Sequence, residues 1–578
     1  MKRVILLIIS IFVYSFAFSQ ALVNNGATMV VESGASINVV GSSYVNNNSG
    51  TINLNGNIKL DGDFVNNSTN GVLVNPNTNG EIIFYGLNHN ISGSTNSVFE
   101  FEKLTVSSGA TVNLSAGKYL TAYGNITNNG TFTLSADVSG TSSLIDNGTI
   151  NGTFKVQQYL TGGNGRFAHF VSNPTSNQTN IYYAQAPTTD YIYRYNELYA
   201  ANASSGWEGW YNNLETMRGY IIRYTNDQTK VFTGTPNTGT IGTDNNVTKT
   251  TSTAHLDRNG FNLVGNPYPS SIDWNAASGW TKTNLDDALY IWKPLAQIYA
   301  TYIINTNTGA NGGTRYIAPG QSFFVRVSSD GYGTLKMNNS VRVHNNVAFM
   351  KNEQTTTPTL HLKVENKKYS DDIAICFLNE ATDLFDKGYD AYKMFSSNDS
   401  VPQLFTQIDS KNLLSINTLK MPNDFSNYSI PIGFKTGFAG NFTISLNDIS
   451  GLSSEQIFLE DLVAGATIDL KANNYSFYST ATNNITRFKL LFAIPTQVDL
   501  LKSQSIQLYS FAQTLYVNIP ENTKSQIVIF DMLGKQVFAK QTSEINNVFE
   551  LSKLHGDYVV KVVTSKETKT KKIFINEK

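Results

Sequence analysis

The sequence predicts an all-β protein in which an N-terminal solenoid of parallel strands precedes β-sandwich domains, the last of them small. Three observations lead to this prediction. Only 15% of the 578 residues are charged, 12% are aromatic, and Asn, Thr, Ser and Gly are abundant. Short runs of alternating apolar and polar residues recur, and Asn, Gly or Pro turns separate them. β-branched and aromatic residues favour strands. At about 150 residues per domain, the chain holds several such units.

The N-terminus has the three parts of a secretory signal peptide. Lys2 and Arg3 supply positive charge, residues 4–18 are apolar and uncharged, and small residues lead up to Ser19. We therefore place cleavage after Ser19, so that residues 1–19 are removed and Gln20 becomes the first residue. A membrane anchor is the alternative, but the apolar run is shorter than the roughly 20 residues of a spanning helix. The sequence predicts a mature chain without a transmembrane segment.

Residues 20–160 predict the solenoid. Short alternating runs such as Thr51–Leu54, Thr111–Leu114 and Thr131–Leu134 recur at intervals of roughly 20 residues, with Asn-Gly or Asn-Asn pairs between them. Alternation indicates strands with one buried face, and Asn and Gly tolerate the left-handed backbone of sharp corners. The pattern resembles the right-handed parallel β-helix of many surface adhesins and polysaccharide lyases. Ordinary hairpins that form a sandwich remain the alternative for this segment.

Residues 161–348 form an aromatic-rich module. The module holds all five tryptophans: Trp207, Trp210, Trp274, Trp280 and Trp292. Gly and Pro break its strands, and Pro267 and Pro269 impose extended or turn geometry around Tyr268. The module resembles one that recurs in large secreted proteins of Bacteroidetes, upstream of a sorting domain. That resemblance implies a lineage and an architecture but no catalytic activity.

Three aromatic residues of this module are candidates for ligand stacking: Trp207, Trp210 and Tyr211, beside Gly209. Exposed aromatic faces stack on the apolar faces of sugars or on partner proteins, because they bury a large area at low entropic cost. The alternative interpretation is that the tryptophans fill a core.

Residues 357–495 predict a β-sandwich module, because several strands follow one another at short spacing. Its markers also resemble the region that precedes the sorting domain in Bacteroidetes secreted proteins. Cys376, the only cysteine, lies in an apolar run, so we expect a buried and inert thiol and no internal disulfide. Asp399-Ser400-Val401 resembles the O-glycosylation signal of these bacteria, which makes Ser400 a candidate for modification.

Residues 506–578 carry the most specific signal in the chain. An Asp-x-x-Gly turn, a Gly-x-Tyr strand and a Lys-Lys-Ile ending occur in order. The residues of this sorting motif are Asp531, Gly534, Gly556, Tyr558, Lys571, Lys572 and Ile573. The segment is similar to the C-terminal (type A) sorting domain of the type IX secretion system. The resemblance implies a small β-sandwich, recognition by the secretion machinery, removal of the domain, and either surface attachment or release.

We find no constellation that predicts catalysis, a cofactor or a metal site. The six histidines are scattered, and a net charge of -1 argues against a nucleic-acid partner. Asp61 and Asp63 alternate on one strand face, but two carboxylates are too few to enclose calcium, and a solvated turn is the simpler interpretation. A glycosidase needs only two carboxylates, so Asp273, Asp286 and Asp287 stay candidates beside the interpretation as turn and cap residues.

These observations predict a secreted or cell-surface, noncatalytic, adhesin-like protein that is exported by the type IX secretion system. The expected partners are the secretion machinery and a carbohydrate or other surface ligand. Two alternatives remain open, namely a secreted carbohydrate-active enzyme or its binding accessory, and a structural component of a surface layer.

Overall fold

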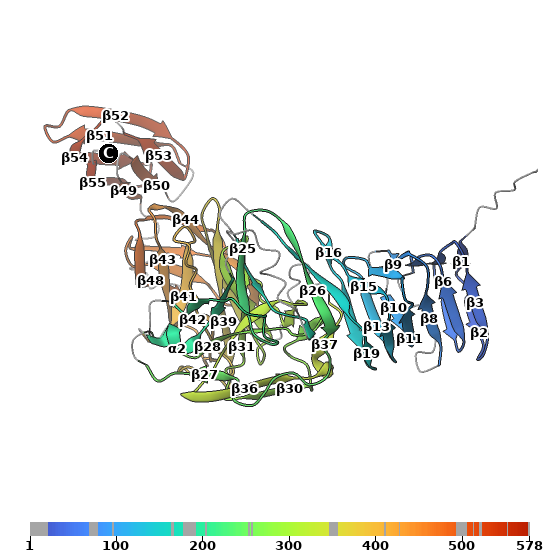
Figure 1. Ribbon diagram of the computed structural model, residues 1–578. Coiled ribbons are helices and arrows are strands. Elements are labelled where there is room, and N and C mark those ends of the chain that lie inside the picture. The colour runs from blue at the N-terminus through green and yellow to red at the C-terminus, as the bar shows by residue number, and fades with distance from the viewer. Residues whose placement is uncertain are drawn as a thin grey trace, which may run out of the picture. The chain divides into compact units, whose positions relative to one another are not determined.

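The computed structural model describes residues 21–68, 79–94, 98–162, 167–176, 192–202, 205–252, 255, 258–345, 357–409, 412–426, 428–492, 506–511, 514–519, 523–551 and 553–575. The predicted signal peptide lies outside these residues. The chain forms two compact units (Figure 1). Unit 1 comprises residues 1–357, 371–401 and 408–420, and unit 2 comprises residues 358–370, 402–407 and 421–578. The module boundaries predicted from the sequence stay a prediction, because a module can share strands between two units.

The N-terminal part of unit 1 is a solenoid with three faces of parallel strands. The first sheet contains β1 (Leu22–Asn25), β4 (Tyr44–Asn47), β7 (Phe64–Asn66), β9 (Asn88–Gly93), β12 (Thr111–Leu114), β15 (Thr131–Leu134) and β20 (Phe154–Leu160). The second contains β3 (Ser36–Val39), β6 (Asn57–Leu60), β8 (Glu81–Phe84), β11 (Lys103–Val106), β14 (Ile126–Asn128) and β19 (Ile150–Asn151). The third face has β2 (Thr28–Val31) with β5 (Thr51–Leu54), then β10 (Val98–Phe101), β13 (Tyr119–Ala122) and β18 (Ser143–Asp146).

Strands of neighbouring coils pair in parallel and in register, as Tyr44 with Phe64 shows. Most inward positions are apolar and buried, and the Tyr44 and Phe64 ring centroids lie 4.9 Å apart. At a corner, the buried amide of Asn46 donates to the Asn66 side-chain oxygen at 3.0 Å and to the Gly50 carbonyl at 2.8 Å. This arrangement confirms the predicted solenoid. The alternative of ordinary hairpins is therefore wrong for this segment, apart from the small hairpin β16 (Ala136–Asp137) and β17 (Gly140–Thr141).

The last coil of the solenoid is covered by the aromatic-rich module. β20 pairs in parallel with β15 on one side and antiparallel with β26 (Gln228–Pro236) on the other. The Leu144 N–H of β18 donates to the Pro269 carbonyl at 2.9 Å. The Arg342 guanidinium forms an ion pair with the Asp146 carboxylate of β18 at 2.6 Å, and both side chains are fully buried. One hydrophobic core thus runs from the solenoid to Tyr220 and Phe232.

The aromatic-rich module consists of small antiparallel sheets. One contains β21 (Phe167–Val171), β25 (Tyr220–Tyr224), β23 (Ile192–Tyr195) and β24 (Trp207–Gly209). A second contains β28 (Phe261–Gly265), β35 (Ser322–Arg326), β31 (Ala288–Lys293), β32 (Ile298–Ile303) and β33 (Thr308–Ala310). Two more contain β27 (Val247–Lys249), β36 (Gly331–Met337) and β30 (Trp280–Thr283), and β34 (Tyr316–Ile317), β29 (Ser271–Asp273) and β37 (Arg342–Val343). The remaining elements are β22 (Thr175–Ser176), which pairs with β26, α2 (Glu197–Asn202) and a 3-10 turn at Asn339–Val341.

Three later strands complete unit 1: β39 (Ser370–Leu378), β40 (Ala391–Tyr392) and β42 (Leu413–Lys420). β39 and β42 are parallel, and β40 is antiparallel to β42. Cys376 of β39 is buried in the same core as Phe170 and Phe324, so the expectation of a buried thiol is confirmed.

Unit 2 holds two groups of antiparallel strands that belong to one sheet and pack as two layers through their aromatic side chains. One layer has β38 (Thr359–Glu365), β44 (Gly440–Ser450) and β47 (Tyr475–Ser479), and the other has β41 (Gln403–Gln407), β43 (Ser429–Thr436), β48 (Thr482–Leu491), β45 (Phe458–Asp461) and β46 (Ala466–Asp469). Phe434 packs against Phe442 and Phe477 at 5.1 Å, and Phe477 packs against Phe488 at 5.1 Å. Such interleaved aromatic residues between layers agree with a sandwich.

The C-terminal part of the chain has a core of its own. Its strands are β49 (Gln507–Phe511), β50 (Thr514–Asn518) and β53 (Asn546–Glu550), and β52 (Gln536–Thr542), β51 (Ser525–Asp531), β54 (Gly556–Val563) and β55 (Thr568–Ile575). Aliphatic residues of both sheets meet, among them Leu515, Ile529 and Val560. The predicted all-β class is confirmed throughout the described residues.

Candidate functional site

The loop that follows β24 presents an aromatic and polar surface. The Trp210 N–H donates to the Ile192 carbonyl of β23 at 2.8 Å, and the Trp210 indole N–H donates to the Asn213 carbonyl at 3.1 Å. The Glu215 N–H donates to the Tyr220 hydroxyl of β25 at 2.8 Å, and burial raises the pKa of Tyr220. Both ends of the loop are thus held by the sheet beneath it.

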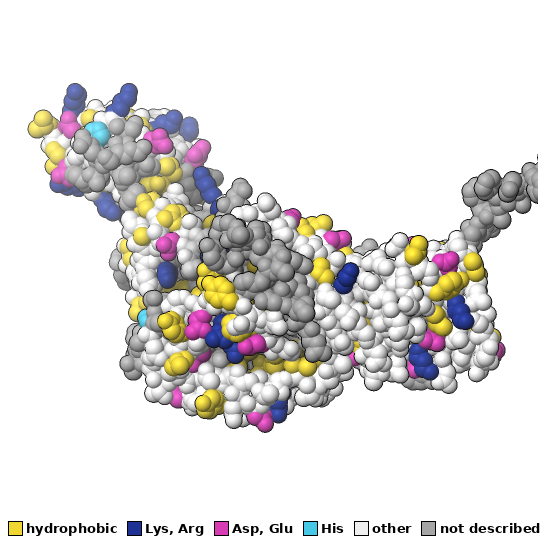
Figure 2. Space-filling model, in the orientation of Figure 1, with side chains coloured by type: hydrophobic (Ala, Val, Ile, Leu, Met, Phe, Trp, Pro, Cys, Tyr) yellow, Lys and Arg dark blue, Asp and Glu magenta, His cyan; other side chains and the backbone are white. Residues whose placement is uncertain are grey.

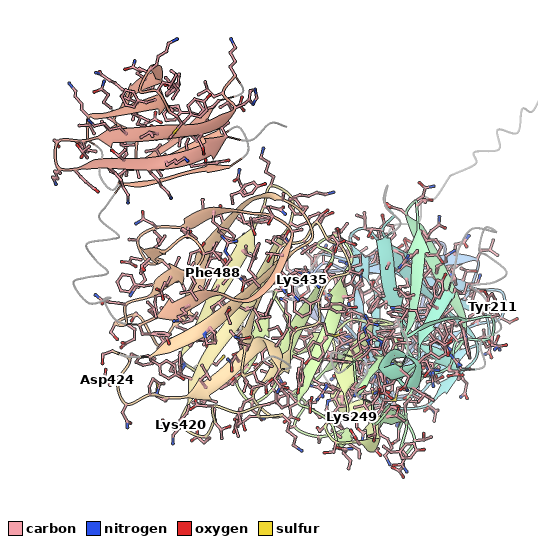
Figure 3. All side chains as sticks on the ribbon, turned by 90° about the vertical axis from the view of Figure 1, so that its left-hand side faces the viewer. Tyr211, Lys249, Lys420, Asp424, Lys435 and Phe488 are labelled. Atoms are coloured by element: carbon pink, nitrogen blue, oxygen red, sulfur yellow. The ribbon has the colours of Figure 1, made fainter. Side chains whose placement is uncertain are left out.

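A shallow depression of about 500 Å³ lies at this loop. It is lined by Trp210, Tyr211, Asn212, Asn213 and Glu215. The Tyr211 side chain is 72% exposed, and Figure 3 shows it at the edge of the molecule in that view. An exposed ring beside two amides and a carboxylate can stack on a flat apolar face while it exchanges hydrogen bonds with hydroxyl groups.

The two tryptophans of the predicted stacking set lie deeper than Tyr211. Trp210 is only 8% exposed, and the Arg194 guanidinium lies 4.4 Å from the centroid of its ring. Trp207 is half-buried and packs against Tyr195 and Phe170, with ring centroids 5.2 and 5.8 Å away. The geometry therefore favours the core interpretation for both tryptophans. The ligand-stacking role stays a prediction, and Tyr211 is the ring of the three that presents most of its surface.

The carboxylates proposed for glycosidase chemistry have other partners. Asp273 accepts two hydrogen bonds of 2.7 Å from Arg315, and Asp286 forms a buried ion pair of 2.9 Å with Arg326. Asp287 accepts from the Asn305 amide at 3.2 Å. The contacts of Asp273 and Asp286 fit structural roles, because an arginine side chain holds each of these two carboxylates.

The two carboxylates considered for calcium, Asp61 and Asp63, lie in the turn between β6 and β7 of the solenoid, so their predicted place on a strand face is wrong and the turn interpretation holds. Asp63 accepts from the backbone N–H of Asn90 at 2.7 Å, a bond between successive coils. The part of the chain that the structure describes contains no group of three or more His, Cys, Asp or Glu side chains that could hold a metal ion.

The sorting-motif residues around the first turn form a compact hairpin. The Asp531 carboxylate at the end of β51 accepts from the backbone N–H groups of Leu533 at 3.0 Å and Lys535 at 2.9 Å. Gly534 has φ = 83°, a left-handed conformation that glycine adopts without strain. The Asp-x-x-Gly pattern thus has a local structural cause, since the Asp closes the turn and the Gly permits it.

The remaining motif residues lie on β54 and β55. Gly556 begins β54 with φ = 104°, and the Tyr558 hydroxyl donates to the His555 carbonyl at 3.3 Å. Ile573 is 4% exposed and belongs to the domain core. Lys571 and Lys572 are exposed on β55, and the Lys572 ammonium forms an ion pair of 2.9 Å with Asp557 of β54.

The predicted modification site is accessible. Ser400 is exposed in a turn, and its backbone N–H donates to the Asn398 side chain at 3.0 Å, whereas the following Val401 is buried. Its glycosylation stays a prediction.

Sequence reasoning did not single out Asn212, Asn213 or Glu215. The only signal in the sequence is a pair of amides directly after an aromatic run, and such pairs also occur at many turns of the solenoid. Three-dimensional proximity to Tyr211 is what distinguishes these residues.

Comparison with known proteins identifies two regions. Residues 61–492 match the family described as Domain of unknown function (DUF8693), and this region spans most of the chain. The chain belongs to the DUF8693 family. The Tyr211 loop and the two sets of candidate carboxylates all lie inside the DUF8693 region.

Residues 511–576 match the Secretion system C-terminal sorting domain. The DUF8693 region is therefore followed by the tail of a type IX secretion cargo protein, as the motif in the sequence predicts. The tail supports a secreted or outer-surface location and handling by the type IX machinery. None of the helices described in the structure has the length and hydropathy required to cross a bilayer.

No curated protein matches this DUF8693 chain. Among solved structures it is similar to the β-glucuronidase of Ruminococcus gnavus, with 10% sequence identity, 72% of this chain covered and a TM-score of 0.12. A second structure of that enzyme, in complex with uronic isofagomine, gives 10% identity, 72% coverage of this chain and a TM-score of 0.10. The match spans 46% of the first enzyme chain and 45% of the second, which is less than half of their length.

Proposed function

We propose that this DUF8693 protein is a noncatalytic, adhesin-like protein of the cell surface or the medium, which binds carbohydrate through the Tyr211 loop. The observation that carries the proposal is the largely exposed Tyr211 ring beside the depression formed with Asn212, Asn213 and Glu215. The chemistry suits a sugar, because the ring supplies an apolar platform and the neighbouring amides and carboxylate supply acceptors and donors for hydroxyl groups.

The rigid base of the loop supports this proposal. Trp210 lies between the core and Arg194, and Arg194 is itself held by Glu208 at 3.0 Å. A ring mounted next to such an anchored residue loses little conformational entropy on binding. The solenoid adds length in single coils that contact only their neighbours, which is a physical means of holding a binding surface away from a cell.

The export route has three parts in our proposal. Residues 1–19 are removed as a signal peptide, so that the chain begins at Gln20 in the periplasm of a Bacteroidetes cell. The sorting domain then directs passage through the outer membrane and is itself removed. The product is attached to the surface or released.

The two alternative functions have less support from the contacts. For an enzyme, Asp273 and Asp286 would have to leave the arginines to which they are bound. A surface-layer component that only assembles with itself does not require an exposed ring in a polar depression. Both alternatives give distinct outcomes in the experiment that follows.

The test is glycan binding by the mature chain and two matched variants. Tyr211→Ala removes the proposed platform, and Tyr332→Ala removes another exposed tyrosine, 67% exposed on β36, as a control. We expect the wild type and the control to bind the same polysaccharides on an array, and Tyr211→Ala to bind about tenfold more weakly, equivalent to about 1.4 kcal/mol.

Three results would contradict the proposal. Equal binding by wild type and Tyr211→Ala would exclude the loop as the site. Release of reducing sugar ends from the bound polysaccharide would favour an enzyme. Ordered self-assembly without affinity for any glycan would favour a surface-layer component.

A further inference from the structure

The first coil of the solenoid has neighbours on one side only. β1 pairs with β4, β2 with β5 and β3 with β6, and none of these three has a second strand partner among the described residues. All three strands are four residues long. The N-terminal end of the solenoid thus consists of three strand edges of equal length.

Alternate residues of these edge strands turn their backbone groups away from the second coil. The N–H of Leu22 donates to the Ser43 carbonyl, and the carbonyl of Ala27 accepts from the Thr51 N–H, so these residues point toward the second coil. Because the backbone groups of successive strand residues point to opposite sides, those of Val23, Thr28 and Val30 point outward. Unpaired edges of this kind are templates for pairing with another chain.

Apolar side chains at this end are incompletely covered. Leu22, Met29 and Ile37 face the solenoid core but are only partly buried. Their register partners in the second coil are Tyr44, Ile52 and Ile58, and each of these is 0% exposed. Another layer of strands on the first coil would bury these three side chains, as the neighbouring coils bury the corresponding side chains of the second coil.

The opposite end of the solenoid is closed by the same chain. β26 lies along the whole of β20, the Pro269 carbonyl accepts from the Leu144 N–H, and the Arg342 guanidinium donates to the Leu144 carbonyl at 2.6 Å. Terminal repeats of solenoids need such a cap for solubility. A head-to-tail stack of copies is therefore blocked, and an open end can only meet another open end.

We propose that the N-terminal end of the solenoid is a self-association surface, on which two copies of the mature chain stack head to head. A two-fold axis makes the facing strands antiparallel and matches three edges with three edges of the same length, which a closed dimer requires. Charge does not oppose the contact, because Glu32 is the single charged residue between positions 21 and 43. Figure 2 shows a largely uncharged surface on the visible face of the solenoid.

This inference rests on one part of the proposed function, the removal of residues 1–19 during export. A leader that is not removed would be joined to the chain just before β1 and would alter the N-terminal end of the solenoid. The dimer presents two Tyr211 loops, and two linked sites bind a repetitive polysaccharide more tightly than one site does.

The test is sedimentation velocity on a chain that begins at Gln20, at concentrations from about 1 to about 200 µM, the range in which small interfaces associate. The variant carries Val23→Lys and Val30→Lys, which put charge on two edge strands at side chains that are each 51% exposed. The control carries Leu87→Lys and Val138→Lys, at solenoid positions 76% and 84% exposed. Hydrogen exchange of the amides in residues 22–39 locates the contact.

We expect the wild type and the control to dimerise with rising concentration, and the Val23/Val30 variant to stay monomeric at least tenfold higher in concentration. Amides of residues 22–39 gain protection as the dimer forms. A monomer throughout the range, equal dimerisation of the edge variant, or protection elsewhere would overturn the inference. Mass spectrometry of the exported protein separates the two proposals. A retained leader contradicts the export proposal, whereas a cleaved but monomeric chain contradicts self-association alone.

Discussion

Replacing Arg342 with Met is expected to destabilise unit 1 by about 3–5 kcal/mol, because it leaves a buried carboxylate without its partner. The Arg342 and Asp146 side chains are both 0% exposed and lie 2.6 Å apart. Arg342 also donates to the Leu144 carbonyl at 2.6 Å and to the Ser270 hydroxyl at 3.1 Å. Met keeps most of the side-chain volume, so the loss reports the charge and the hydrogen bonds more than a cavity.

Urea titration followed by tryptophan fluorescence measures this effect, since all five tryptophans lie in unit 1. The wild type and the Met variant are compared by the midpoint of the transition and its slope. A second variant, Arg342→Met with Asp146→Asn, removes the unpaired charge and should recover about 1–3 kcal/mol of the loss. A loss below about 1 kcal/mol for Arg342→Met, or no recovery in the double variant, would refute the reasoning.

Three further predictions follow from single positions. Burial raises the pKa of Asp390 to about 7, so the folded chain holds this proton more strongly than the unfolded chain, and stability is expected to fall as pH rises from about 4 to about 7. Urea midpoints across this range should show that fall, and Asp390→Asn should flatten it. Gly62→Ala would place a Cβ atom 1.9 Å from the Ser42 carbonyl oxygen of the preceding coil, and should lower stability by about 1–3 kcal/mol in thermal unfolding followed by circular dichroism. Gly534→Val forces a β-branched residue into φ = 83° at the sorting-domain turn, and should reduce the secreted fraction on immunoblots of medium and periplasm.

Each of these predictions has a result that would contradict it. A pH profile that is identical in wild type and Asp390→Asn would mean that another group titrates. Gly62→Ala is compared with Gly34→Ala, where no atom lies within 4 Å of the added Cβ and the loss comes from the left-handed backbone (φ = 80°) alone. A loss for Gly62→Ala well below that of Gly34→Ala would contradict the claim that the close approach of the Ser42 carbonyl matters. Normal export of Gly534→Val would show that export does not depend on the geometry of this turn.

Local sequence patterns predicted those parts of the fold that depend on contacts between residues close in sequence or repeated at regular intervals. The solenoid follows from alternating runs with Asn at the corners, and Asn46 shows why, because its amide bridges to the next coil. The sorting-domain turn follows from Asp531 and Gly534, since both act within a few residues of themselves. Such features can be recognised in a sequence because the residues involved contact others that are nearby in the chain or that recur at a regular spacing.

Long-range packing was not predictable in the same way. The sequence leaves Trp210 open to a surface or a core position, and only the structure shows that Arg194 of β23 covers its ring. In the sequence, Asp146 is one of the few charged residues of the solenoid, and nothing near it indicates its partner Arg342, which is 196 residues away. Ala374 and Ile416 are recognisable as strand residues, but nothing local indicates that they join the core around Phe324.

The most direct test of the account compares export of the wild-type chain with that of a chain lacking residues 506–578, by mass spectrometry of the periplasm, cell surface and medium. The account predicts a wild-type product outside the outer membrane that begins at Gln20 and lacks the sorting domain, and a truncated chain that stays in the periplasm. Normal export of the truncated chain would contradict the account, because a secreted binding protein of this kind depends on its C-terminal domain to reach the surface.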